Sequence, residues 1–371
     1  MSKTVLKSLR AGSRLPMVKP LAAAIILAAT CAGQAQAQSN VTIYGRVDAG
    51  IDYNSNQYNA SNGQRGGKWG TGGNSWGTSM FGFKGTEDLG GGLKAIFTLE
   101  NGFNAGNGSI NGSSPNNPAQ IWSRRSFVGL SGDFGTVKIG RDLTLPSDIV
   151  WSLDPTGQQN LGSATLVKGR NWPQTSNQVQ YISPSFGGFT AQGAYGFGET
   201  PGATKPKSSS GIALSFVQPG YSLVAMYDVA NDGAGRYSTL FTNSKELTLG
   251  GTVNIDKLKL YAAYQNLSAP QDVTTGSTKA NHFWVGANYQ LTPALTLIAA
   301  AYHVKLNQNV GSANLFMVGT NYSLSKRTLL YASIGTVRNG SNTNFQVESG
   351  DGTGLTGQNQ NAFYTGVSHS F

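Results

Sequence analysis

Apolar and polar residues alternate in short segments along most of the chain after residue 38. Residues 41–53 give a clear example. Their apolar positions are Val41, Ile43, Val47, Ala49 and Ile51, and their polar positions are Thr42, Tyr44, Arg46, Asp48 and Asp52. The same period of two returns around residues 93–100 and 282–291. Because neighbouring side chains of a β-strand point to opposite faces, this pattern predicts strands with one apolar and one polar face.

About 16 such segments follow one another, and helical spacing is seldom sustained. The expected strands lie near residues 41–53, 76–88, 93–104, 122–132, 136–144, 174–186, 189–199, 209–218, 221–230, 245–254, 258–268, 281–292, 295–306, 313–325, 327–339 and 361–371. An even number of antiparallel strands is typical of bacterial membrane barrels.

The connections between these segments alternate in length. The short turns include residues 89–92, 132–135, 187–188 and 325–326, and the long polar loops include 54–75, 105–121, 145–173 and 340–360. Short turns at one side of a membrane and long loops at the other are typical of outer-membrane barrels. In a soluble sandwich, loop length is not expected to differ so regularly between the two ends. A closed sheet also pairs every backbone group inside hydrocarbon. We therefore expect an all-β, 16-stranded antiparallel transmembrane barrel, too wide for side chains to fill.

The first 37 residues have the pattern of a secretory leader. Five basic residues precede an apolar run at 21–29, and Ala35-Gln36-Ala37 fits a cleavage site. The run is shorter than the roughly 20 residues that a membrane-spanning helix needs. Thr30 stands before Cys31 where a lipid-attachment site has Gly, Ala or Ser. We expect residues 1–37 to be a cleaved signal peptide and residues 38–371 to form the barrel.

Composition narrows the function classes. The chain has 50 glycines, one cysteine and only 12% charged residues, so a disulfide framework and a multi-thiolate metal site are excluded. The formal net charge is +10, but without the leader 22 basic residues face 17 acidic ones. This small and unclustered excess does not indicate a nucleic-acid partner.

Five long blocks stand in order along the chain. They are VTIYGRVDAGID at 41–52, GFKGTEDLGGGLKAIFTLE at 82–100, RRSFVGLSGDFGTVKIGR at 124–141, YISPSFGG at 181–188 and LSKRTLLY at 324–331. Together with the terminal aromatic residue Phe371, these blocks resemble the Gram-negative general porins, most closely the β-proteobacterial type. The resemblance implies a homotrimer of 16-stranded barrels in the outer membrane. It also implies that the third external loop of each barrel folds inward to form a constriction.

Carried over position by position, the resemblance gives the constriction a basic wall. Its expected members are Arg46, Lys84, Arg124 and Arg170, with Lys168 and Arg141 as further members. Alternation along the strands points the first three into the lumen if Ile43, Phe83 and Phe127 face lipid. The loop at 145–173 supplies two acidic residues, Asp148 and Asp154, and we expect a net positive constriction.

These features predict a general diffusion porin that prefers anions and uses no reaction, cofactor or metal. Its expected partners are small hydrophilic solutes and ions, further copies of the chain, and outer-membrane lipid and lipopolysaccharide. We also expect the machinery that inserts barrels to recognise Phe371, which shares a strand face with Val367 and Phe363.

Catalytic alternatives rest on weak motifs. Residues 73–77 match the nucleophile-elbow pattern and residues 352–357 match the dinucleotide fingerprint, but neither motif has the strand-to-helix context that its chemistry needs. His282, His303 and His369 lie on separate strand patterns without the paired spacing of metal ligands. An outer-membrane barrel enzyme and a non-conducting structural or adhesin barrel stay as alternatives. Inward-pointing cations argue against a non-conducting barrel, because they repel one another unless they face water.

Overall fold

A computed structural model describes residues 40–59, 61–110, 120–273, 276–348 and 355–371. The expected signal peptide lies outside these residues. The strands are β1 (Asn40–Asn59), β2 (Gln64–Gly70), β3 (Ser79–Gly90), β4 (Leu93–Phe103), β5 (Arg125–Gly132), β6 (Gly135–Leu143), β7 (Gln174–Ile182), β8 (Phe189–Gly196), β9 (Ser209–Gln218), β10 (Tyr221–Ala230), β11 (Lys245–Ile255), β12 (Leu258–Ser268), β13 (Lys279–Gln290), β14 (Leu295–Leu306), β15 (Gly311–Ser323), β16 (Thr328–Asn339) and β17 (Gln360–Ser370).

Short helices occur between β6 and β7. They are α2 (Leu145–Ile149), η2 (Val150–Leu153) and η3 (Ser163–Val167). In the described part of the chain, no helix has the length and apolar character needed to cross a membrane.

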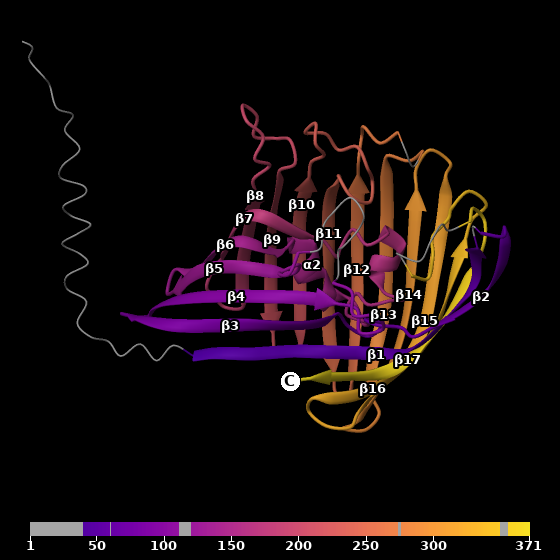
Figure 1. The fold of residues 1–371 in the computed structure, drawn as a ribbon, viewed down its shortest axis with the longest axis horizontal. Helices are drawn as coiled ribbons and strands as arrows, with labels where there is room; N and C mark the ends of the chain where they lie inside the picture. Colours follow the sequence, from indigo (N-terminus) through magenta and orange to yellow (C-terminus); the bar gives the residue numbers. More distant parts are fainter. Residues whose placement is uncertain (1–39, 60, 111–119, 274–275, 349–354) are drawn as a thin grey trace, which may run out of the picture. The chain divides into compact units, whose positions relative to one another are not determined.

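The strands form one antiparallel sheet that closes on itself (Figure 1). From β3 to β17, each strand pairs with the next one in the chain. The ring closes through β1, in which Ala49 lies opposite Val367 of β17 and Ile43 lies opposite Phe83 of β3. With β1 and the strands from β3 to β17, the ring has 16 strand positions. The expected 16-stranded barrel is therefore confirmed.

The remaining strand, β2, lies where the sequence predicts a loop at 54–75. β1 extends beyond the ring, and β2 runs back along this extension as a hairpin. A bulge follows Asn54, and Asn56 has a φ of 56°, so the apolar–polar alternation breaks there. The rings of Tyr53 and Trp69, with centroids 4.8 Å apart, connect the two strands. Since β2 is rich in glycine and polar residues, its sequence carries no strand period.

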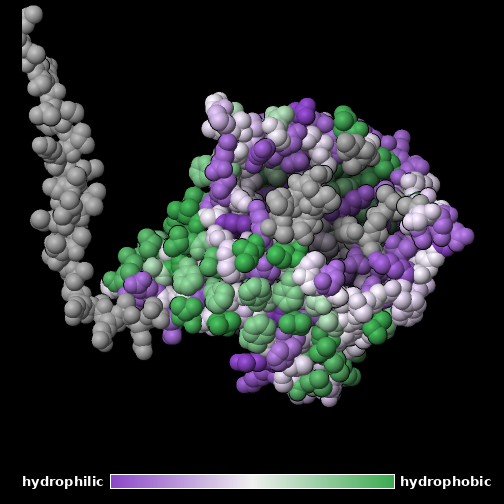
Figure 2. Space-filling model, viewed as in Figure 1, coloured by the Kyte–Doolittle hydropathy of each residue, from purple (hydrophilic) through white to green (hydrophobic). Residues whose placement is uncertain are grey.

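The apolar faces of the strands point out of the barrel. Ile43 is 64% exposed, Val128 61% and Val285 59%. Figure 2 shows apolar side chains gathered over the region of β3 to β6. An apolar outer face combined with a polar interior suits a wall that stands in hydrocarbon and encloses water.

Close apolar packing occurs inside the barrel, where the segment between β6 and β7 meets the wall. The buried residues of this contact include Leu145, Leu153, Leu161, Leu166, Trp284 and Tyr302. The indole Nε1 of Trp284 on β13 donates a hydrogen bond to the Leu153 carbonyl at 2.8 Å. The segment is thus folded into the lumen, as expected for the third long loop.

Candidate channel constriction

Residues 144–173, here called the inner loop, narrow the lumen. The loop begins at Thr144, whose hydroxyl accepts a hydrogen bond from the Ser147 N–H at 3.4 Å and caps α2. Pro146 occupies the first turn of this helix. The N–H groups there have no acceptor within the helix, so the missing N–H of proline costs no hydrogen bond. The capped turn places Asp148 opposite the strand wall, where its carboxylate lies 3.0 Å from Arg125.

Arg170 is expected to line the channel, but its side chain is buried between the inner loop and the barrel wall. Its guanidinium donates to Asp228 Oδ1 at 2.8 Å and to Ser244 Oγ at 3.2 Å, and lies 3.4 Å from Glu246 Oε2. Burial alone would lower the pKa of Arg170, but the nearby carboxylates outweigh this effect and hold the pKa above its usual value. Arg170 therefore fastens the inner loop to β10 and β11 and adds no free charge to the lumen.

Asp154, the second expected acidic residue of the constriction, is also buried. Its Oδ1 accepts hydrogen bonds from the Tyr302 hydroxyl and the Thr156 N–H, both at 2.8 Å. Its Oδ2 accepts one from the Ser163 N–H at 2.5 Å. The carboxylate thus braces the inner loop against β14 and does not face the open channel. Sequence spacing could not reveal this, because the bonds depend on how the loop turns back on itself.

A set of paired charges, here called the charge ladder, lies on the wall beside α2. Its members are Glu100, Arg124, Arg125, Lys138, Asp142 and Asp148. Arg124 Nε lies 2.7 Å from Glu100 Oε1, and Lys138 Nζ lies 2.5 Å from Asp142 Oδ2. Arg125 forms ion pairs with both Asp142 and Asp148. Since three cations face three carboxylates, the charge ladder is neutral as a whole.

The residues of β5 that face the lumen are shifted by one position from those that the sequence predicts. Phe127 lies opposite Thr98, which in turn lies opposite Lys84, so all three side chains share the lumen face. Arg125, two residues before Phe127, therefore points inward and is a lumen residue that periodicity missed. Arg124 reaches the lumen only because it precedes the regular strand. A shift of one residue exchanges the two faces of a strand, and the Arg-Arg pair gives no hint of which phase is correct.

Arg46 and Lys84 lie on the lumen face, as expected. Neither has a carboxylate within ion-pair distance among the described residues. Arg46 Nε donates to the Thr78 carbonyl at 3.0 Å, and its guanidinium carbon lies 5.4 Å from the Trp76 ring centroid. Lys84 Nζ lies 5.1 Å from the ring centroid of Tyr44. Aromatic faces hold these cations in place, and Asp48 and Glu100 act on the charge of Arg46 from beyond ion-pair distance.

Lys168 ends η3 in the left-handed region, with a φ of 49°. Its Nζ donates to Asn344 Oδ1 at 2.8 Å and lies 5.7 and 5.3 Å from the ring centroids of Phe241 and Phe345. Among the described side chains, no carboxylate forms an ion pair with it. Lys168 is thus a third cation without an ion-pair partner among the described residues.

Arg141 does not join the constriction, contrary to expectation. It pairs across from Ser126 and shares a strand face with Ile139, which is 57% exposed on the outside of the barrel. Its Nε donates to the Ser123 carbonyl at 2.8 Å, and its terminal nitrogen donates to Ser176 Oγ at 2.7 Å. The period of two from Ile139 therefore turns Arg141 outward.

The three histidines lie on β13, β14 and β17, and His282 and His303 stand at neighbouring positions on opposite faces of paired strands. His282 is hydrogen-bonded to Gln265, His303 to Asn314 and His369 to Thr328. No cluster of three or more potential metal ligands occurs in the ranges that the structure describes. The second catalytic motif, at 352–357, lies partly outside those ranges.

Comparisons with known proteins agree with this geometry. A family model described as Gram-negative porin matches residues 22–343. Outer membrane porin protein 32 of Delftia acidovorans is 34% identical, over 96% of this chain and 100% of its own length. An outer membrane porin protein of Bordetella pertussis is 31% identical, over 67% of this chain and 69% of its own. The solved structure of the anion-selective porin from Comamonas acidovorans superposes with a TM-score of 0.76 at 27% identity, over 90% of this chain and 100% of that chain.

Proposed function

Because this chain belongs to the Gram-negative porin family, we propose that it is a general diffusion channel of the outer membrane that prefers anions. The family consists of channels and not of enzymes. Small hydrophilic solutes and ions pass down their gradients through the lumen, and the charges at the narrow point bias which ions pass.

The observation that supports anion preference is the charge balance around the inner loop. The charge ladder is neutral, and Arg170 is compensated by Asp228 and Glu246. Arg46, Lys84 and Lys168 add positive charge, and among the described residues no carboxylate pairs with them. Two unit charges about 8 Å apart in water interact by about 0.5 kcal/mol, and by more in a narrow pore. The name of the Comamonas relative, an anion-selective porin, points the same way.

The homotrimer is a further part of the proposal. The family resemblance implies it, and Arg141 supports it from this structure. A cation on the outer face of β6 is costly against hydrocarbon, and contact with a second copy of the chain would remove that cost. The measured mass of the purified particle tests this, because a monomeric barrel would contradict it.

Export and membrane contacts complete the proposal. We expect cleavage after Ala37, insertion by the barrel-assembly machinery, and contact of the long loops with lipopolysaccharide. N-terminal sequencing of the protein from outer membranes tests the cleavage site, with Gln38 expected as the first residue.

Reconstitution in a planar bilayer tests the channel itself. We expect stepwise conductance in three equal sublevels, and in a salt gradient a reversal potential on the anion side that shrinks as salt rises. A cation-side reversal potential would overturn the charge assignment. Absence of conductance would instead favour a structural or adhesin barrel.

A further inference from the structure

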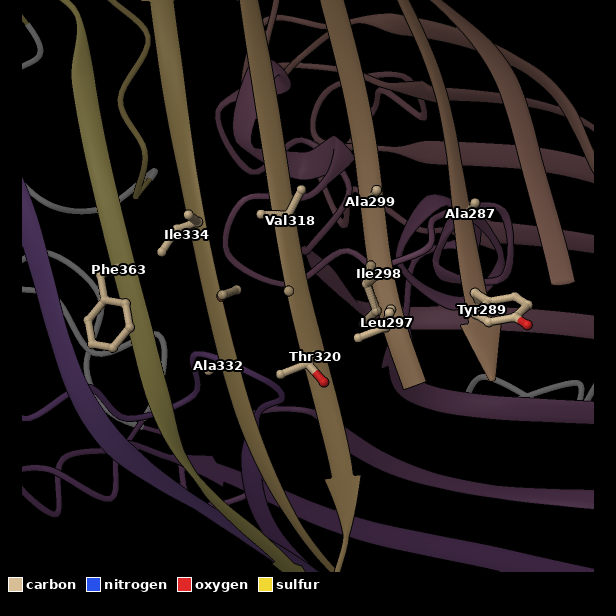
Figure 3. Close-up of a pocket in the computed structure, with 12 residues that line it drawn as sticks. Ala287, Tyr289, Leu297, Ile298, Ala299, Val318, Thr320, Ala332, Ile334 and Phe363 are labelled. Carbon is tan, nitrogen blue, oxygen red and sulfur yellow. The ribbon is translucent and has the colours of Figure 1, made fainter. Parts of the chain in front are cut away.

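An apolar groove of about 510 Å³ lies on the outer face of the wall, across β13 to β17 (Figure 3). We call it the outer groove. Its floor is formed by the small side chains of Ala299, Thr320 and Ala332. Its rim is formed by the larger side chains of Tyr289, Ile334 and Phe363. Thr320 lies directly opposite Ala332, and Ile334 lies opposite Phe363 one step along the same faces. Small side chains between large ones thus make a shallow furrow that extends across neighbouring strands.

Two threonine hydroxyl groups in and beside this groove are satisfied within the wall. Thr320 Oγ1 donates to the Thr296 carbonyl at 3.0 Å, and Thr365 Oγ1, next to Ala332 on the neighbouring strand, donates to the Tyr331 carbonyl at 3.0 Å. A hydroxyl without a partner in hydrocarbon would be costly. Because these two donors are already used and most of the other lining residues are aliphatic, the outer groove suits an apolar occupant.

A cationic turn lies at the end of the same hairpin. Lys326 and Arg327 lie between β15 and β16, both are exposed, and neither forms an ion pair with a described carboxylate. Arg327 is five residues from Ala332, or roughly 17 Å at about 3.3 Å per residue along a strand. Leu324, 57% exposed, continues the apolar outer face up to the turn.

We propose that the outer groove binds one acyl chain of an anionic phospholipid whose phosphate lies at Lys326 and Arg327. This proposal rests on the outer-membrane location proposed above, because only there does hydrocarbon cover the groove. The lipid fits both features: its headgroup meets the two cations at the short-turn end, and its chain passes along the apolar outer face to the furrow. A second copy of the chain would cover the apolar furrow but would leave the paired cations unexplained.

Native mass spectrometry tests the proposal on protein reconstituted in vesicles of phosphatidylethanolamine and phosphatidylglycerol and then extracted in mild detergent. We expect the unmodified protein to retain phosphatidylglycerol in preference to phosphatidylethanolamine. Ala332→Leu fills the floor and should remove the retained lipid. Replacing Lys326 and Arg327 by Gln should lower the preference for phosphatidylglycerol by about fivefold for each cation.

Matched controls come from the same wall. Ala225→Leu makes the same change on the outer face of β10, and Lys257→Gln removes a cation from another short turn. Both should leave lipid retention unchanged. Retention by the Ala332→Leu variant equal to that of the unmodified protein would overturn the proposal.

A photoreactive group attached through Ala332→Cys separates the possible occupants. Cross-links to phospholipid support the proposal, and cross-links to a second copy of the chain overturn it. All the variants should keep the single-channel conductance of the unmodified protein. Loss of lipid binding with intact conductance therefore concerns the outer groove alone, whereas a non-conducting unmodified protein would contradict the channel function.

Discussion

At the scale of the residue, the charge of the lumen depends on what each cation touches. Arg124, Arg125 and Arg170 each have carboxylate partners, so their charges are largely compensated within the protein. Arg46 and Lys84 rest against aromatic rings, which orient a cation but leave its field in place. A plain count of basic residues therefore overstates the positive potential and misplaces it.

Replacing Arg46 and Lys84 by Gln tests this distinction. Each change should lower the anion-to-cation permeability ratio by about twofold, because each removes an interaction of about 0.5 kcal/mol at 8 Å in water. Reversal potentials in a low-salt gradient measure the ratio. Lys205→Gln in an external loop serves as the control and should change the ratio little. An unchanged ratio in the Arg46 and Lys84 variants would show that these cations do not face the ion path.

Asp148→Asn should have the opposite effect. Asp148 is the most exposed carboxylate of the charge ladder, with 27% of its side chain accessible, and its removal leaves Arg125 paired with Asp142 and close to Glu100. One negative charge at the narrow point is lost, so the anion preference should rise by about twofold. The same salt-gradient measurement checks it. A shift toward cations would mean that the ladder reorganises when this carboxylate is removed.

At the scale of the element, a buried ionic latch holds the inner loop, in addition to its apolar packing and the hydrogen bonds of Asp154. Arg170 lies between Asp228 of β10 and Glu246 of β11, with 2% of its side chain accessible. Breaking a buried pair on one side leaves uncompensated charge, which costs far more than removing the whole set. A change to one side of the latch should therefore disturb the position of the inner loop and with it the width of the channel.

Arg170→Met should destabilise the barrel by about 3–5 kcal/mol and make the open-channel current noisy, because two buried carboxylates lose the cation that compensates them. Unfolding by urea and single-channel recordings measure the two effects. The triple variant with Asp228→Asn and Glu246→Gln should recover most of the stability. If the triple variant is as unstable as Arg170→Met, the latch does not act through charge.

The sequence predicts most elements of this fold, and the exceptions have physical causes. Strands that separate hydrocarbon from water carry a strict period of two, and their positions agree closely with β3 to β17. β2 stands beyond the ring, where no hydrocarbon selects apolar residues, and it carries no such period. The lumen-facing direction of Arg46 and Lys84 follows from the same period, whereas the burial of Arg170 and Asp154 depends on contacts between the inner loop and distant strands that local spacing does not encode.

At the scale of the whole molecule, the barrel depends on joining its two ends. Phe371 completes this joint, since its backbone N–H and carbonyl both pair with Gly45 at 3.1 Å. Its ring also covers Gly45, where an added Cβ would lie 2.4 Å from the Phe371 ring. The terminal residue thus has a structural role in addition to its expected role in recognition.

Deleting Phe371 should leave precursor in the periplasm, because both the outward aromatic and two closing hydrogen bonds are lost. Phe371→Ala separates the roles, since it keeps the backbone pairing and removes only the ring. Fractionation and heat-modifiable mobility on gels measure assembly. Normal assembly of the deletion variant would refute both roles, and normal assembly of Phe371→Ala alone would restrict the role to backbone closure.

Closure of β17 on β1 has a kinetic consequence. The pairing of Arg46 with Ser370 joins residues from opposite ends of the domain, so the closing contacts have very high contact order. The chain must lose the conformational entropy of closing so long a loop before these contacts form and stabilise the barrel. Folding is slow for such topologies. Until β17 pairs with β1, both strands present unpaired edges flanked by apolar faces, a combination that favours aggregation. The polypeptide must therefore remain soluble and open until its synthesis and export are complete.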